Sequence, residues 1–233
     1  MFVALLWGIR IAGLLPGVSL VSYGVYPRRP EGLAGIVLAP LIHGSFAHLF
    51  ANTAPILVLV TALLYGYPRS ARIVLPVVYL GSGLAVWLLA RPAYHVGASG
   101  LAFGLMFFIF TMGVVRRDRM AIALSLVVFL LYGGMIWGVL PTDPSVSFEY
   151  HLFGATLGVL LAFALRRHDP PPPEKSYSWE EEGDQGSEEL PPPASSNASH
   201  RPPSHRLIPG SGPRAAGHGP PSPPDNGCRG RPG

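Results

Sequence analysis

The stretch GASGLAFGLMFFIFTMGVV, residues 97–115, holds no charged side chain and ends just before two arginines. An α-helix needs roughly 20 apolar residues to cross the hydrocarbon core of a bilayer, and this stretch is close to that length. Outward from it in both directions, further apolar runs alternate with short polar loops as far as residue 167. We therefore predict an all-α membrane protein.

Six apolar runs are candidates for transmembrane helices. The first lacks a basic start and a small-residue cleavage site, so we interpret it as a span and not as a removed signal peptide. Together the runs predict a six-helix bundle in a membrane domain of residues 1–167. The runs lie near residues 2–22, 46–66, 72–90, 98–115, 121–140 and 150–165.

Residues 168–233 have a different composition, with 16 of the 26 prolines and few large apolar side chains. Such a segment cannot bury enough apolar surface to offset the entropy lost on ordering. We predict a disordered, Pro/Gly-rich cytosolic tail. The single cysteine, Cys228, lies in this tail, which excludes an intramolecular disulfide.

The arginines predict the orientation of the bundle. If the N-terminus is cytosolic, the inside segments hold seven arginines and the outside segments hold three. The positive-inside rule therefore favours a cytosolic location for both termini. Arg10 falls within the first run, and we interpret it as a side chain that snorkels to the cytosolic face. Because topology explains the positive charge, nucleic-acid binding is not expected.

Four polar residues within the runs fall at one depth in this topology. His48 and Asn52 open the second run, Ser99 opens the fourth and His151 opens the sixth. All three runs begin at the outer face. Polar groups inside membrane spans are costly and usually functional, so the sequence predicts a site near the outer face, built from three helices.

Ser99 stands at a helix start in the Gly-x-Ser-Gly pattern of residues 97–100. Free backbone N–H groups at a helix start suit a developing oxyanion, but a serine needs a neighbouring base. His151 shares a helix face with Gly154 and Gly158, and close packing of these glycines against the fourth span would bring the histidine toward Ser99. Alone, either motif would also fit simple small-residue packing.

His48 and Asn52 are four residues apart and share a helix face. Both side chains can donate hydrogen bonds to a tetrahedral oxyanion, where one donor is worth about 3–4 kcal/mol in a soluble protease. The alternative is that they bond neighbouring loops or close a helix end. No H-E-x-x-H zinc motif and no pair of intramembrane aspartates is present, so neither a metal nor an organic cofactor is predicted.

Three segments together resemble the rhomboid intramembrane serine proteases: HGSFAHLFAN at 43–52, GASG at 97–100 and HLFG at 151–154. They occur in the order and on the spans typical of that family, and the resemblance covers residues 1–167. It is closest to the compact six-span bacterial members. The resemblance implies an endopeptidase that cuts single-pass transmembrane proteins near their outer end, within lipid, in a prokaryotic plasma membrane.

The resemblance also implies roles for individual residues. Ser99 would attack the substrate carbonyl, and His151 would take and return the proton. His48, Asn52 and the Ser99 backbone N–H would line the oxyanion hole. Glu149 points about 160° away from His151 on an ideal helix and is not expected to join them. The supporting positions are His43, Gly97, Gly100, Phe103, Gly154 and Gly158.

Two positions depart from the family pattern, and one loop is expected to move. Phe103 replaces a frequent tyrosine one turn after the serine, and Tyr150 stands where a small residue is usual. The loop 141–148, with two prolines and two serines, is expected to be a lid that admits substrate.

Two other functions are compatible with a membrane bundle. A non-catalytic rhomboid-like protein that binds membrane clients would usually lack the serine or the histidine, and both are present here. A small transporter or channel would distribute polar residues through the midplane, whereas here they gather at one face.

Overall fold

The computed structural model of the chain describes residues 1–15, 19–143 and 146–170. This part of the chain is helical and contains no strand, which confirms the predicted all-α class. The predicted disordered tail lies outside the described residues, except for 168–170.

Five helices are long and apolar enough to cross a membrane. Their bounds agree with five of the predicted runs to within a few residues, and α3 has the predicted bounds. Arg119–Tyr132 continues directly into the 3-10 helix η4, and together they make one span. The five are α3 (Phe46–Gly66), α4 (Pro68–Leu89), α5 (Ser99–Arg116), α6 with η4 (Arg119–Tyr132 and Gly133–Val139) and α7 (Phe148–Leu165).

The first run forms a shorter helix than predicted. Helix α1 covers Phe2–Ala12, and its last turn closes where the N–H of Gly13 donates to the carbonyl of Ile9. The 3-10 helix η1 (Leu20–Tyr23) follows. The first run therefore does not form one continuous α-helix over residues 2–22. The bonds that span four residues end at Gly13, and the N–H groups of Leu14 and Leu15 donate to the carbonyls of Ile11 and Ala12, three residues back.

Arg10 lies at the end of the bundle where α3 begins. The Trp7 indole N–H donates to Thr53 Oγ1 at 3.2 Å, and the Arg10 guanidinium lies 4.8 Å from the ring centre of Phe46, the first residue of α3. These two contacts show that α1 runs antiparallel to α3. In the predicted topology α3 begins at the outer face, so this position of Arg10 does not agree with snorkelling to the cytosolic face.

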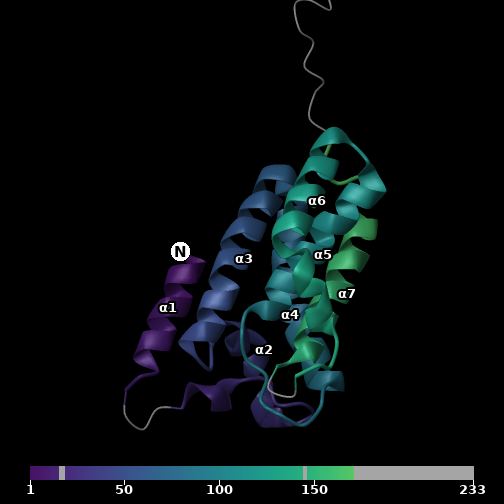
Figure 1. Ribbon diagram of the computed structural model, residues 1–233. Helices are drawn as coiled ribbons and strands as arrows, with labels where there is room; N and C mark the ends of the chain where they lie inside the picture. Colours follow the sequence, from purple (N-terminus) through teal and green to yellow (C-terminus); the bar gives the residue numbers. More distant parts are fainter. Residues whose placement is uncertain (16–18, 144–145, 171–233) are drawn as a thin grey trace, which may run out of the picture. The chain divides into compact units, whose positions relative to one another are not determined.

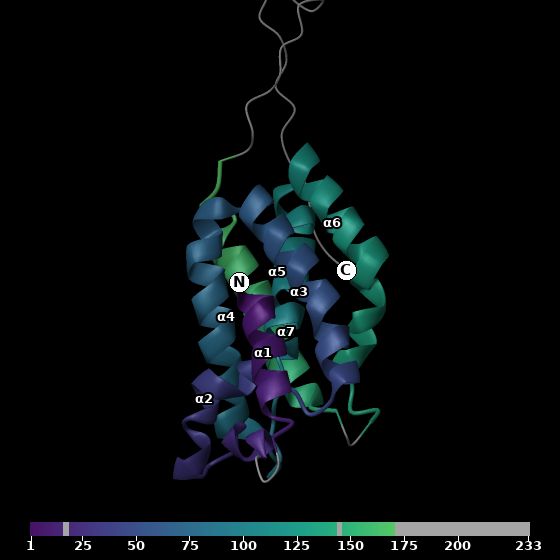
Figure 2. The same ribbon diagram turned by 90° about the vertical axis from the view of Figure 1, so that its left-hand side faces the viewer.

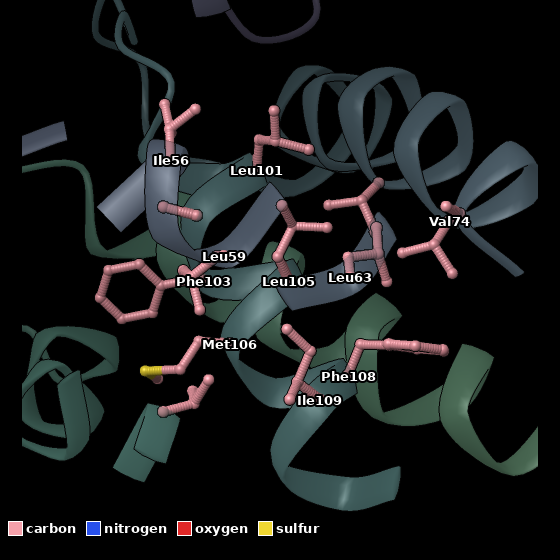
Figure 3. Close-up of a cluster of buried hydrophobic side chains, with 14 of the residues drawn as sticks. Ile56, Leu59, Leu63, Val74, Leu101, Phe103, Leu105, Met106, Phe108 and Ile109 are labelled. Carbon is pink, nitrogen blue, oxygen red and sulfur yellow. The ribbon is translucent and has the colours of Figure 1, made fainter. Parts of the chain in front are cut away.

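Helix α5 forms the centre of the bundle. Two-thirds of its membrane-spanning window is buried, against 11% for α6, which lies at the periphery. Its side chains pack with those of α3 and α4 in one apolar cluster, part of which is drawn in Figure 3. The glycines Gly100 and Gly104 let neighbouring helices approach α5 closely. The first turn of α5 is thereby held at a fixed place in the bundle.

The segments before α3 gather at the end of the bundle where α3 and α5 begin (Figures 1 and 2). They include the short helix α2 (Gly35–Leu38) and the 3-10 helices η2 (Pro30–Gly32) and η3 (Ala39–Leu41). Val25 and His95 exchange two backbone hydrogen bonds, and the N–H of Gly97 donates to the carbonyl of Ala39 at 2.9 Å. These bonds fix the loop that leads into Ser99.

At the other end of the bundle, Asp169 closes the start of α4. Its carboxylate accepts the backbone N–H groups of Arg69 and Ser70 at 2.8 and 3.1 Å, and its side chain is buried. A carboxylate is favourable at a helix N-terminus because four N–H groups are otherwise unpaired there. The packed part of the chain thus continues through Asp169, two residues past the boundary expected at 167.

Candidate active site

The four polar residues predicted to lie at one depth line a single cavity. Ser99, His151, His48 and Asn52 border a space of about 870 Å³, together with Phe103. Each of the three helices that carry them contributes its first or second turn. Helix starts leave backbone N–H groups unpaired, so the cavity lies where hydrogen-bond donors for an anion are available.

Ser99 is the first residue of α5, and the loop before it has a conformation that requires glycine. Gly97 has φ +113°, and a Cβ there would lie 2.6 Å from the imidazole of His48. The ring of His48 therefore packs directly on the backbone two residues before Ser99. His43, whose ring packs against that of His48 with centroids 5.0 Å apart, supports the same loop, because its Nε2 accepts the N–H of Ala98 at 3.4 Å.

His43 is nearly fully buried, and its titration gives a pH-dependent stability. Burial, reinforced by neighbouring His48, lowers the pKa of His43 from 6.5 to about 4. The unfolded chain therefore binds this proton at a higher pH than the folded chain. The stability that His43 contributes is fully present above about pH 6.5 and is lost as the pH falls toward 4.

We expect wild-type protein in detergent to lose stability between about pH 7 and pH 5 more steeply than His43→Gln. Glutamine keeps an acceptor for the Ala98 N–H but cannot titrate. Chemical unfolding at both pH values measures the difference. Parallel losses in the two proteins would contradict the assignment of this titration to His43.

Helices α5 and α7 pack through the glycines that the sequence singled out. A Cβ on Gly154 would overlap the carbonyl of Gly100, and a Cβ on Gly158 would overlap that of Gly104. Gly100 also makes room for the buried ring of Tyr150. The unusual size of Tyr150 is thus accommodated by a residue of the serine motif, on the side of α5 that faces α4.

The His151 ring is held on two sides. Its Nδ1 lies 2.8 Å from the carbonyl oxygen of Gly138, and its plane stacks on Phe103 with centroids 4.1 Å apart and 4° between planes. A carbonyl only accepts, so Nδ1 carries the proton and Nε2 is left as an acceptor. In the described part of the chain, Ser99 and His151 face one cavity without a hydrogen bond between them, as is common in substrate-free sites.

Asn52 and His48 provide donors on the α3 side of the cavity. The Asn52 amide donates one N–H to the carbonyl of His48 at 2.9 Å, which holds the side chain against its own helix. An amide has a second N–H for another acceptor. Ser45 caps α3 by accepting the His48 N–H at 3.0 Å, so the start of α3 is well defined.

Contacts that sequence reasoning missed tie the start of α7 to the loop before α5. His95 Nδ1 lies 2.5 Å from Ser147 Oγ, and Arg91 donates to the carbonyl of Val146 at 2.8 Å. Arg91 also pairs with Glu149 at 3.3 Å. The carboxylate that stands closest in sequence to His151 is thus engaged by an arginine. Residues 144–145 of the expected lid lie outside the described residues.

No group of three or more His, Cys, Asp or Glu side chains in the described residues could hold a metal ion. A family model described as a rhomboid domain matches residues 30–168. The chain belongs to the rhomboid family. With its five long apolar helices, this rhomboid protein is a multi-pass integral membrane protein.

Relatives of this rhomboid protein occur in mycobacteria. An uncharacterized protein of Mycobacterium tuberculosis is 37% identical over 175 residues, which cover 70% of this chain and 72% of the relative. A protein of Mycobacterium bovis matches with the same values. One of Mycobacterium leprae is 35% identical over 174 residues, covering 70% of this chain and 68% of the relative.

Proposed function

We propose that this rhomboid protein is an intramembrane serine endopeptidase with Ser99 as nucleophile and His151 as general base. The observation that carries the proposal is the single cavity lined by Ser99, His151, His48 and Asn52. These residues come from three helices, and a nucleophile, a base and oxyanion donors are what acyl transfer requires.

The chemistry follows from the roles of these groups. Ser99 Oγ attacks the substrate carbonyl while Nε2 of His151 takes its proton, and the imidazolium later returns that proton to the leaving amine. The Asn52 amide, the His48 ring and the Ser99 backbone N–H stabilise the oxyanion. Because the His151 Nδ1–H donates a hydrogen bond to the Gly138 carbonyl, the neutral ring keeps Nε2 unprotonated and able to act as a base.

The proposed topology defines the side of the membrane on which the active-site cavity binds its substrate. In this proposal α1 and its flanking residues complete a sixth crossing, both termini are cytosolic, and the cavity opens toward the outer face of a prokaryotic plasma membrane. Seven arginines against three support this orientation, and the mycobacterial relatives support the prokaryotic setting. The substrates are single-pass transmembrane proteins, unwound and cut near their outer end.

The test is cleavage of single-pass reporters by the full chain in proteoliposomes, with the cut mapped by mass spectrometry. We expect a cut within about two helical turns of the outer end of the reporter's span. Cuts at the cytosolic end would overturn the orientation. If no reporter of a varied panel is cut, while reporters are retained as a stable complex, the client-binding alternative would replace the enzyme.

A further inference from the structure

We propose that the backbone carbonyl of Gly138 is a positioning group for His151, in the place where a soluble serine protease uses a carboxylate. This inference rests on the proposed function. Gly138 lies in η4, at the end of the span formed by α6 and η4, 13 residues before the histidine. Its carbonyl oxygen is 2.8 Å from Nδ1 of His151.

The Gly138 carbonyl can accept a hydrogen bond from His151 because the residues that follow it in the sequence do not supply a backbone donor. Within η4 the hydrogen bonds run from residue i+3 to residue i, and the last of them joins the Leu140 N–H to the Trp137 carbonyl at 3.1 Å. The next donor in that pattern would be residue 141, which is a proline and has no N–H. The N–H of Thr142 donates instead to the carbonyl of Leu140 at 2.8 Å. Pro141 therefore leaves the Gly138 carbonyl for the histidine.

Residue 138 must also be a glycine for this approach. A Cβ there would lie 2.7 Å from Cζ of Phe103 and 3.3 Å from Nδ1 of His151. Phe103 in turn stacks on a face of the histidine ring, in parallel and at 4.1 Å. The imidazole is thus held at its Nδ1 edge by the Gly138 carbonyl and on one face by the ring of Phe103, and a single methyl group on residue 138 would disturb both contacts.

The acid closest in sequence to His151 is engaged elsewhere. Glu149 pairs with Arg91 at 3.3 Å. A backbone carbonyl carries no formal charge, but it fixes the tautomer and the ring plane, as the orienting carboxylate of a soluble serine protease also does. Since Gly138 belongs to the end of the span formed by α6 and η4, the base is oriented only when that end is packed on α7.

The test compares Gly138→Ala with Gly134→Ala, because Gly134 lies in the same 3-10 helix and a Cβ there meets nothing within 4 Å. We expect Gly138→Ala to lower kcat at least about 10-fold with KM nearly unchanged. Gly134→Ala should match wild type. Rates are expressed per active site counted by titration with a serine-directed inhibitor, so that partial unfolding does not imitate the effect.

A second readout does not depend on proteolysis. In full-length protein labelled with ¹⁵N-histidine, and with His151→Gln for assignment, the neutral His151 ring should carry its proton on Nδ1 in wild type and lose that preference in Gly138→Ala. If Gly138→Ala does not fold, Pro141→Ala serves instead, since its new N–H competes for the same carbonyl. A wild-type ring protonated on Nε2, or unchanged tautomer and kcat in the variant, would overturn the inference. A wild type that cuts no reporter but shows the expected tautomer would instead count against the proposed function alone.

Discussion

Ser99→Ala is expected to abolish cleavage of every reporter that the wild type cuts. Without Oγ no acyl-enzyme forms, and removal of the nucleophile from a soluble serine protease costs about 10⁶-fold in kcat. We expect a loss of at least about 10³-fold here, limited by assay background. Ser99 is nearly buried at the first turn of α5, and alanine fits that space, so the fold should be retained.

Thr156→Ala provides the matched control for this loss. Like Ser99→Ala, it removes one hydroxyl from a membrane helix. Thr156, however, is exposed on α7, and its hydroxyl donates a hydrogen bond to the carbonyl of Leu152 on the same helix. Its activity should equal that of wild type. Persistent cleavage in Ser99→Ala, after exclusion of contaminating proteases, would assign the nucleophile to another residue.

Gly154→Ala is expected to have the second-largest effect, through packing and not through chemistry. Its Cβ would overlap the backbone carbonyl of Gly100, so α5 and α7 would have to separate. Overpacking of a close contact typically costs about 1–3 kcal/mol. The separation also moves His151 relative to Ser99, and a displacement of about 1 Å can lower the rate about 10²-fold. We therefore expect loss of both stability and activity.

Gly8→Ala is the control for Gly154→Ala, because a Cβ on Gly8 in α1 meets nothing within 4 Å. Unfolding in detergent and reporter cleavage are measured on both variants. Gly8→Ala should behave as wild type in both assays. A Gly154→Ala variant as stable and active as Gly8→Ala would show that α5 and α7 do not need this close contact.

The sequence predicted the spans well where one helix crosses the whole bilayer. The second run was placed at 46–66 by its apolar composition, as observed; in the structure Ser45 caps the start of this helix, which ends at Gly66. The helix predicted from the first run ends at Ala12, although apolar residues continue, because the α-helical bonds that span four residues end at Gly13. Hydropathy records the composition of a segment and not where its backbone hydrogen bonds stop.

The site was predictable to the extent that it depends on helix ends. When successive helices of a bundle run antiparallel, every second helix opens at the same face, which is why Ser99, His151 and His48 could be placed together. Gly138 was not foreseen, because its role depends on a carbonyl left unpaired by Pro141 and on a 3-10 geometry that hydropathy does not reveal. The contact of His95 with Ser147 joins two loops 52 residues apart, and no local pattern indicates such a contact.

The measurement that tests the proposed enzyme most directly is covalent labelling of the folded protein by a fluorophosphonate, with the modified peptide identified by mass spectrometry. It needs no knowledge of the substrate. The proposal predicts one modified residue, Ser99, and labelling that falls steeply in His151→Ala. Absence of labelling in the wild type under conditions where it remains folded, or modification of a different serine with equal rates in both proteins, would contradict the Ser99–His151 dyad.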